Sequence, residues 1–282
     1  MRIREAHAIR DRIKVMLILM ALMIAIGMLA HTVRQKEESH KTASIETLLK
    51  TALQPVGSTM YIWGGGWDDA DNGSGTSSTR LGLSTVWETF SKEQDETYDF
   101  ENHRFEREKG LDCSGFVGWV LYNTFETREG KTGYVTSSTD MAESLAAKGW
   151  GKLIQNPQNF LPGDIVSMEG HVWISLGTCE DGSVLLVHSS PPGVSVCGTP
   201  STLQFQMTEE SAGGQSMAVT IATEYMGKYH PKWQEKYPNR QVNLSYLENV
   251  TLFRWSREIM SDAKKIQEKS AEEMIRILSP DM

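Results

Sequence analysis

The segment that begins at Asp112 constrains the fold more than any other part of the chain. It reads Asp-Cys-Ser-Gly, and apolar residues then recur at the i, i+4 spacing of a buried helix face. These residues are Phe116, Val117, Val120 and Leu121. Asp112 stands where a side chain caps a helix N-terminus. We therefore predict a helix over about 113–125 whose first residue is a cysteine.

The apolar pattern elsewhere predicts an α+β fold. Strands are expected at 165–168, 171–176, 184–188 and 247–255, and a second helix at 140–149. A C-terminal helix is expected over 256–282, with one apolar face formed by Ile259, Ala263, Ile266, Met274, Ile277 and Leu278. Residues 35–54 are predicted as a helical linker, since Ile45, Leu48, Leu49 and Leu53 recur at helical spacing. The main domain is expected over 55–255.

Residues 1–34 form a targeting or anchoring segment. Basic residues precede an apolar run from Val15 to Ala30, and such a run is short for a full span and long for a signal peptide. An uncleaved anchor is favoured because the small residues that a cleavage site needs are poorly matched, but both interpretations stay open. The positive flank predicts that the domain lies outside the cytoplasm, at the cell membrane or secreted.

Composition excludes several classes of protein. The chain has 282 residues, 39% of them hydrophobic, and a formal net charge of −8. This composition predicts a globular core and argues against a nucleic-acid partner, which needs a basic surface. The 3 Cys residues are an odd number, so at least one stays unpaired in an oxidising compartment.

Cys113 is the first candidate for chemistry. A thiol at a helix N-terminus is expected to have a lowered pKa and to be a better nucleophile. A lone Cys beside Phe116 and Val117 is equally typical of a small core residue. The position alone leaves both interpretations open.

Two histidines are candidates for the base. A hairpin loop of two or four residues over Cys179–Gly182 would put His171, Trp173 and His188 on one face of the sheet. A three-residue loop without a bulge would put His188 on the other face. On one face, His171 would be the general base and acid, and His188 would orient its ring. Two unrelated histidines remain the alternative.

The other cysteines offer competing interpretations. Zinc ligands could come from His171, Cys179, His188 and Cys197, but the close ligand spacings typical of zinc sites are absent, so no metal and no cofactor is expected. Cys179 and Cys197 could instead form a disulfide, which would leave Cys113 as the free thiol.

Taken in order along the chain, the motifs resemble those of the NlpC/P60 family of cell-wall cysteine peptidases. They are Tyr61-Ile-Trp-Gly-Gly65, Leu111-Asp-Cys-Ser-Gly-Phe-Val117, Leu161-Pro-Gly-Asp164, Gly170-His-Val172 and Val187-His188. The resemblance covers about residues 55–197 and extends to the last strand. It implies a papain-like fold with N-terminal helices packed on an antiparallel β-sheet.

The resemblance also implies roles for individual residues. Cys113 would be the nucleophile, His171 the base and acid, and His188 the residue that orients His171. Tyr61 would lie near the active site, and Asp112 and Ser114 would hold the free amine end of a short peptide. Trp173 is a candidate substrate-binding residue on a separate ground, the hairpin face that it is expected to share with the histidines. The implied substrate is a peptidoglycan stem peptide, cleaved between D-γ-glutamate and the diamino acid.

The chain departs from the family pattern at two insertions, 67–109 and 199–245. The first is predicted as a surface excursion, either a lid over the site or an idle loop. Wall-binding modules of the SH3 or lysin-motif type are not recognisable, so the membrane segment would hold the enzyme near its polymer. A related thiol amidase or acyltransferase, and a catalytically silent wall-binding domain, are the alternative functions.

Overall fold

A computed structural model describes residues 14, 16, 19–20, 22–28, 43–125, 132–202 and 215–279. The chain divides into two compact units, Met1–Thr42 and Ala43–Met282, which we describe separately. The described residues of the first unit are helical. Within the described ranges, no helix has both the length and the apolar character needed to cross a membrane. Most of the predicted anchor over 1–34 lies outside those ranges.

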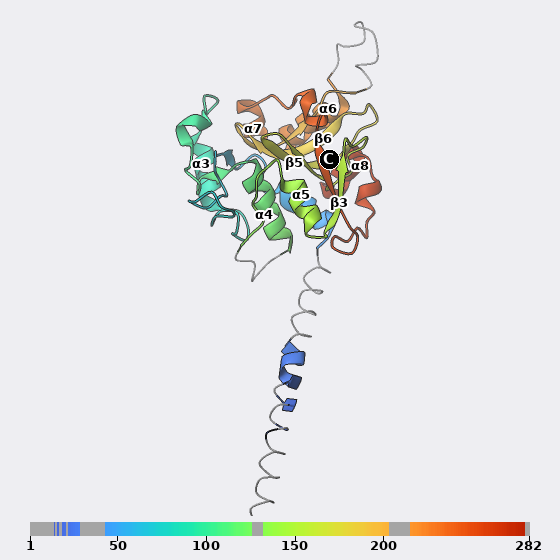
Figure 1. The fold of residues 1–282 in the computed structure, drawn as a ribbon. Helices are drawn as coiled ribbons and strands as arrows, with labels where there is room; N and C mark the ends of the chain where they lie inside the picture. Colours follow the sequence, from blue (N-terminus) through green and yellow to red (C-terminus); the bar gives the residue numbers. More distant parts are fainter. Residues whose placement is uncertain are drawn as a thin grey trace, which may run out of the picture. The chain divides into compact units, whose positions relative to one another are not determined.

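The second unit is built on one eight-stranded sheet with strand order β2-β1-β7-β6-β5-β4-β8-β3 (Figure 1). Its strands are β1 (Met60–Tyr61), β2 (Gly110–Leu111), β3 (Gly151–Gln155), β4 (Ile165–Met168), β5 (His171–Thr178), β6 (Val184–Ser190), β7 (Gly193–Gly198) and β8 (Thr251–Trp255). Neighbouring strands are antiparallel except β1 and β2, which pair in parallel at one edge. The strands predicted at 165–168, 171–176 and 184–188 are confirmed, and the antiparallel sheet has this one parallel pair. The strand predicted at 247–255 is shorter, since Leu247 ends a 3-10 helix and β8 begins at Thr251.

Seven α-helices of this unit are described with their bounds. They are α2 (Ile45–Leu53), α3 (Thr85–Glu93), α4 (Cys113–Phe125), α5 (Met141–Ala147), α6 (Met217–Tyr229), α7 (Pro231–Lys236) and α8 (Ala271–Leu278). Helix α4 contacts β5 and β6, while α6 lies against β7. In Figure 1, α3 lies at one side of the domain and α8 at the opposite side. The predicted helices at 113–125 and 140–149 are confirmed.

Side-chain alternation along the central strands divides the apolar residues between two clusters. Val172 and Ile174 of β5 join the main core, together with residues of α2, α4 and α6. Trp173, between them, points to the other side and joins a smaller cluster with Phe160 and Leu186. Alternation of this kind places successive side chains on opposite faces of a sheet.

Two predicted segments differ from the structure. Helix α2, expected to be a linker, is part of the main core, because Ile45, Leu48 and Leu49 are fully buried. The C-terminal helix is shorter than predicted, because α8 begins only at Ala271. Its N-cap residue Ser270 forms a capping box with Glu273 in the first turn. Turns and a short 3-10 helix, Ile266–Glu268, occupy the residues before it.

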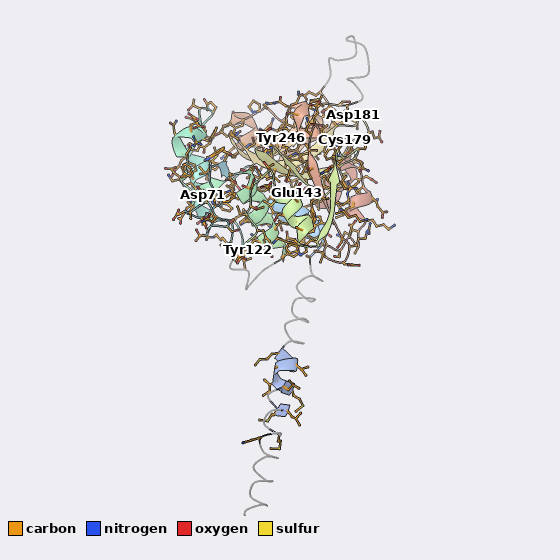
Figure 2. All side chains as sticks on the ribbon, in the orientation of Figure 1. Asp71, Tyr122, Glu143, Cys179, Asp181 and Tyr246 are labelled. Carbon is orange, nitrogen blue, oxygen red and sulfur yellow. The ribbon has the colours of Figure 1, made fainter. Side chains whose placement is uncertain are left out.

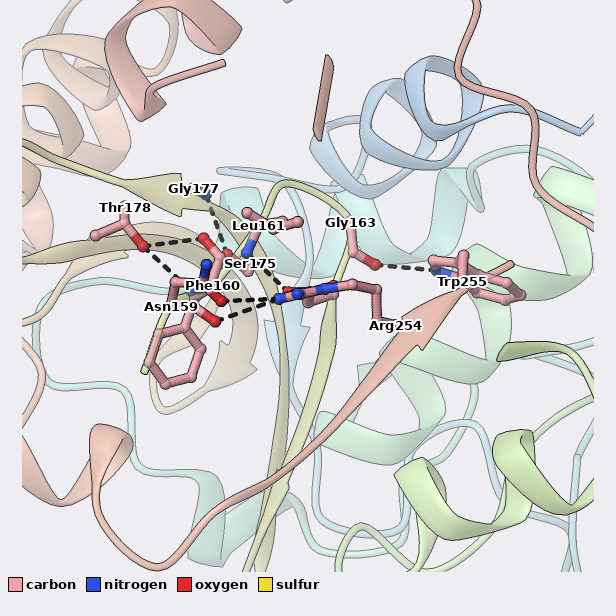
Figure 3. Close-up of polar contacts among 10 residues, drawn as sticks. Asn159, Phe160, Leu161, Gly163, Ser175, Gly177, Thr178, Arg254 and Trp255 are labelled. Carbon is pink, nitrogen blue, oxygen red and sulfur yellow. Dashed lines mark hydrogen bonds and ion pairs between the residues drawn. The ribbon is translucent and has the colours of Figure 1, made fainter. Parts of the chain in front are cut away.

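The Leu161–Asp164 turn is held by an ion pair between buried Asp164 and the partly exposed side chain of Arg254, which is labelled in Figure 3. The Arg254 side chain of β8 donates to both carboxylate oxygens of Asp164, with Nη2 at 2.7 Å from Oδ2. Trp255 Nε1 donates to the carbonyl of Gly163 at 3.0 Å. Burial raises the pKa of Asp164 to about 6, against the opposing effect of Arg254. The turn therefore joins β4 firmly to the last strand.

Candidate active site

Asp112 starts helix α4 and so fixes the position of Cys113. The Asp112 carboxylate accepts from the backbone N–H of Gly115 at 2.7 Å, and its carbonyl accepts from Phe116 N–H at 2.9 Å. This is the predicted N-cap. Gly115 is required here, because a Cβ atom would lie 2.0 Å from the carbonyl oxygen of Gly65. Helix α4 thus enters against the Gly64–Gly66 turn.

The predicted lowering of the Cys113 pKa is wrong in this structure. Burial, together with the negative charge of Asp112, raises the pKa of Cys113 to about 12. Backbone N–H groups of Val172, Ser114 and Cys113 act in the opposite direction but are outweighed. The thiol is therefore protonated at neutral pH, and a base must remove its proton when it reacts.

His171 and His188 form the predicted pair. His171 Nε2 lies 3.0 Å from His188 Nδ1, which leaves Nδ1 of His171 for proton exchange. Burial lowers the pKa of His171 to about 4. His171 precedes Val172, whose backbone N–H acts on the Cys113 thiol. The first turn of α4 therefore meets the start of β5. Cys113, the nucleophile candidate, interacts with the backbone of Val172, and His171, the base candidate, is the residue before Val172.

The hairpin brings the two histidines to one face, as predicted, but through an odd-length loop and a bulge in place of a loop of two or four residues. The strands end at Thr178 and Val184, which pair with each other, so the loop has an odd number of residues. An irregularity between Ser175 and Gly177 then shifts the register, and Ile174 pairs with Val187. A β-bulge of this kind inserts one extra residue in one strand. It restores the register that brings His188 to the face of His171.

Two residues complete the surroundings of the histidines and were missed by the sequence analysis. The Tyr246 ring lies 5.3 Å from that of His171, and its hydroxyl is 3.5 Å from His188 Nδ1. In Figure 2, Tyr246 is labelled beside the central strands. Buried Arg240 is the second: burial lowers the pKa of His188, and His171 and Arg240 lower it further. Arg240 lies in the insertion at 199–245 and Tyr246 directly follows it, and no periodic pattern marks either residue.

A pocket of about 360 Å³ opens above Cys113. Its lining includes three predicted site residues besides Cys113, namely Tyr61, Asp112 and Ser114. Trp63, Trp67, Asp71 and Phe105 form further walls, with Ser137, Ser138 and Gly170 at the remaining side. Asp71 lies on the α3 side of the domain in Figure 2. Trp67, Asp71 and Phe105 belong to the first insertion, so this segment builds part of the pocket.

The other end of the insertion is tied to the site through Tyr98. Its hydroxyl donates to the Tyr61 carbonyl at 2.6 Å, and Trp87 and Phe90 of α3 are buried in the main core. The prediction of a surface excursion is therefore wrong for this part of the insertion, because Trp87 and Phe90 are core residues.

Trp173, His171 and His188 are predicted site residues that do not line this pocket, and Trp173 lies furthest from its predicted role. Its side chain is fully buried in the smaller cluster and stacks on Phe160 with a centroid distance of 5.5 Å. It shares the face of the histidines, as predicted, but it is buried against Phe160 and Tyr246 and does not line the pocket.

Cys113, Cys179 and Cys197 are all buried free thiols, so the possible Cys179–Cys197 disulfide is absent. Within the described ranges, no group of three His, Cys, Asp or Glu side chains could hold a metal ion. Of the candidate zinc ligands, only His171 and His188 lie in contact.

Comparisons of the chain with protein-family models, with curated proteins and with solved structures find no match. A functional interpretation therefore depends on the motifs and on the geometry of this site.

Proposed function

We propose that the protein is a cysteine peptidase that hydrolyses an amide bond in peptidoglycan stem peptides, between D-γ-glutamate and the diamino acid. The observation that carries the proposal is the meeting of α4 and β5. Cys113, at the start of α4, lines a pocket. His171, at the start of β5, is hydrogen-bonded to His188 of β6. A nucleophile, a base and a third group that orients the base are the parts that acyl transfer needs.

In the proposed reaction, His171 Nδ1 takes the thiol proton as Cys113 Sγ attacks the substrate carbonyl carbon. The tetrahedral intermediate carries its negative charge on oxygen, and backbone N–H groups at the start of α4 stabilise it. His171 then returns the proton to the leaving amine as the C–N bond breaks, which leaves a thioester on Cys113. A water molecule, deprotonated by His171, hydrolyses the thioester and releases the acid.

His188 fixes His171 in the orientation for this reaction. Because His171 uses Nε2 for His188, the ring presents Nδ1 toward the α4 side. Tyr246 packs against both rings and limits their movement. The low pKa that burial gives to His171 keeps the imidazole in the neutral form, which can accept a proton at neutral pH.

The test uses the full chain and two cysteine variants with solubilised stem peptides, and identifies products by mass spectrometry. The chain is expected to cleave one peptide bond and to release both an acid and an amine. Cys113→Ala is expected to lose at least about 10⁴-fold in rate, since the covalent route is gone. Cys179→Ala is the matched control, because it removes another buried thiol that lies outside the pocket.

Three results would contradict the proposal. Cleavage that persists in Cys113→Ala would exclude the thiol mechanism. No cleavage of any stem peptide or crosslinked fragment by the unaltered chain would exclude the peptidase and favour a wall-binding domain. Transfer of the acyl group to an added amine, in place of water, would reassign the protein as an acyltransferase.

A further inference from the structure

The polar groups that a substrate amine would need are already occupied within the protein. Ser114 Oγ donates to Asp112 Oδ1 at 2.8 Å and accepts from Trp67 Nε1 at 2.9 Å. Its hydroxyl hydrogen is therefore used, and one of its two lone pairs accepts from the indole N–H. An ammonium group, which has only donors, could use only the remaining lone pair, beside the Trp67 N–H that points at the same oxygen.

Asp112 is occupied in the same way. Its carboxylate accepts from Ser114 and from the Gly115 N–H, and the backbone N–H groups of Gly64 and Ser114 add further hydrogen bonds. A carboxylate has about four lone-pair sites, so these donors fill its capacity. The side chain is also buried, with 7% of its surface exposed. A charged amine would gain little here and would lose its hydration.

The wall next to these groups is apolar and aromatic. Trp63 is 44% exposed and Phe105 is 53% exposed, and both line the pocket. Phe105 N–H donates to the Trp63 carbonyl at 2.8 Å, and the guanidinium of Arg104 lies 4.9 Å from the Trp63 ring. Large apolar side chains that stay exposed at a site indicate a binding surface.

The backbone of Phe105 supports the same interpretation. It has a φ of 63°, which is a strained conformation for a residue with a bulky side chain. In this conformation the ring lies against Gly64, whose Cβ position would be 3.0 Å from Phe105 Cδ1. The surface formed by Trp63 and Phe105, here called the aromatic shelf, is thus fixed beside Ser114 and Trp67.

From these contacts we infer that the site takes stem peptides whose amino end is acylated, as it is when the peptide is still linked to its glycan, in preference to peptides with a free amine. The inference rests on the proposed function. An acyl group removes the positive charge and gives an apolar group that can pack on the aromatic shelf. Trp67 is the specificity-determining residue, because its indole N–H covers the oxygen that a free amine would otherwise use.

The experiment compares kcat/KM of the full chain on one stem peptide with a free amino end and on the same peptide N-acetylated. The acetylated peptide is expected to be preferred by at least about tenfold. In Trp67→Phe the ring stays and the N–H is lost, so Ser114 Oγ can accept from an ammonium group. Because a charge-assisted hydrogen bond is worth about 10- to 100-fold in affinity, the preference is expected to fall by at least about tenfold.

Trp233→Phe is the matched control, since Trp233 lies in α7 and does not line the pocket. It is expected to keep the preference of the unaltered chain. Equal or faster cleavage of the free-amine peptide by the unaltered chain overturns the inference and leaves the peptidase intact, and this comparison needs no variant. An unchanged preference in folded Trp67→Phe, checked by circular dichroism, overturns the role of Trp67. Cleavage of neither peptide refutes the proposed function itself.

Discussion

The buried Cys113 and the half-buried His171 are both uncharged at neutral pH, and this distinguishes the site from one with a preformed thiolate and imidazolium. Burial raises the pKa of Cys113 to about 12 and lowers that of His171 to about 4. The positive end of α4 favours an anion, but Asp112, which caps that same end, brings a negative charge beside the sulfur. Asp112 therefore stabilises the start of the helix and at the same time opposes ionisation of the Cys113 thiol.

This environment predicts how the free protein reacts with iodoacetamide. The alkylation rate of Cys113 is expected to rise about tenfold per pH unit between pH 6 and 9, with no plateau, since the thiolate fraction is far from saturation. Subtracting the rate of Cys113→Ala removes the contribution of Cys179 and Cys197. A plateau with a midpoint between pH 5 and 7 would show instead that a thiolate is already formed.

The desolvation that lowers the pKa of His171 predicts how activity changes at acid pH. His171 must be neutral to accept the thiol proton, and it becomes protonated as pH falls through its lowered pKa of about 4. On the proposed mechanism, kcat/KM is therefore expected to persist down to about pH 5 and to be lost below pH 4. Loss centred near pH 6.5, the ordinary range of histidine, would contradict this prediction.

At the scale of elements, Arg107 organises the first insertion around the pocket. Its Nη2 atom lies 2.6 Å from Asp71 Oδ1, and its Nη1 atom donates to the Asp68 carbonyl and reaches Asp69 Oδ1 at 3.3 Å. Its guanidinium also lies 5.3 Å from the ring of Phe105. One side chain thus holds both the 68–71 turn and the aromatic shelf at the pocket rim.

Arg107→Ala is expected to raise KM by about threefold or more with kcat nearly unchanged, because the wall becomes mobile while Cys113 and the histidines are untouched. An interaction made equally in the ground and transition states affects KM alone. Steady-state kinetics on a stem peptide measures the effect, and Arg257→Ala, which breaks an exposed ion pair with Glu268, is the control. A fall in kcat with KM unchanged would place Arg107 in the chemical step.

The elements differ in how far the sequence predicts them, for physical reasons. Helix α4 and the strands around His171 and His188 follow from periodic apolar residues, because local pattern and tertiary burial agree there. The register of the histidines depends on a bulge near Leu176, which no residue pattern marks. The walls of the pocket come from the insertion, where Trp67 and Phe105 meet Ser114 through contacts that are distant in sequence.

At the scale of the whole molecule, the two ends of the Ala43–Met282 unit stabilise each other. Ile45 N–H donates to the Ser261 carbonyl at 2.9 Å, and Ser261 N–H donates to the Ala43 carbonyl at 3.0 Å. Helix α2 contacts both α4 and α8. Periodicity predicts α2 as a helix but does not reveal its partners, and this is why it is mistaken for a linker when the sequence is considered alone.

A truncation series separates the two interpretations of α2. A chain that begins at Ala43 keeps the whole described core and is expected to unfold with the same urea midpoint as the full chain. A chain that begins at Pro55 loses Ile45, Leu48 and Leu49, which are fully buried and are worth about 1.5–3 kcal/mol each. That loss of about 5–9 kcal/mol is comparable with the whole stability of an ordinary domain, so this chain is expected to be largely unfolded without denaturant. Far-UV circular dichroism measures both, and a cooperative transition at an unchanged midpoint for the shorter chain would restore α2 to the role of a linker.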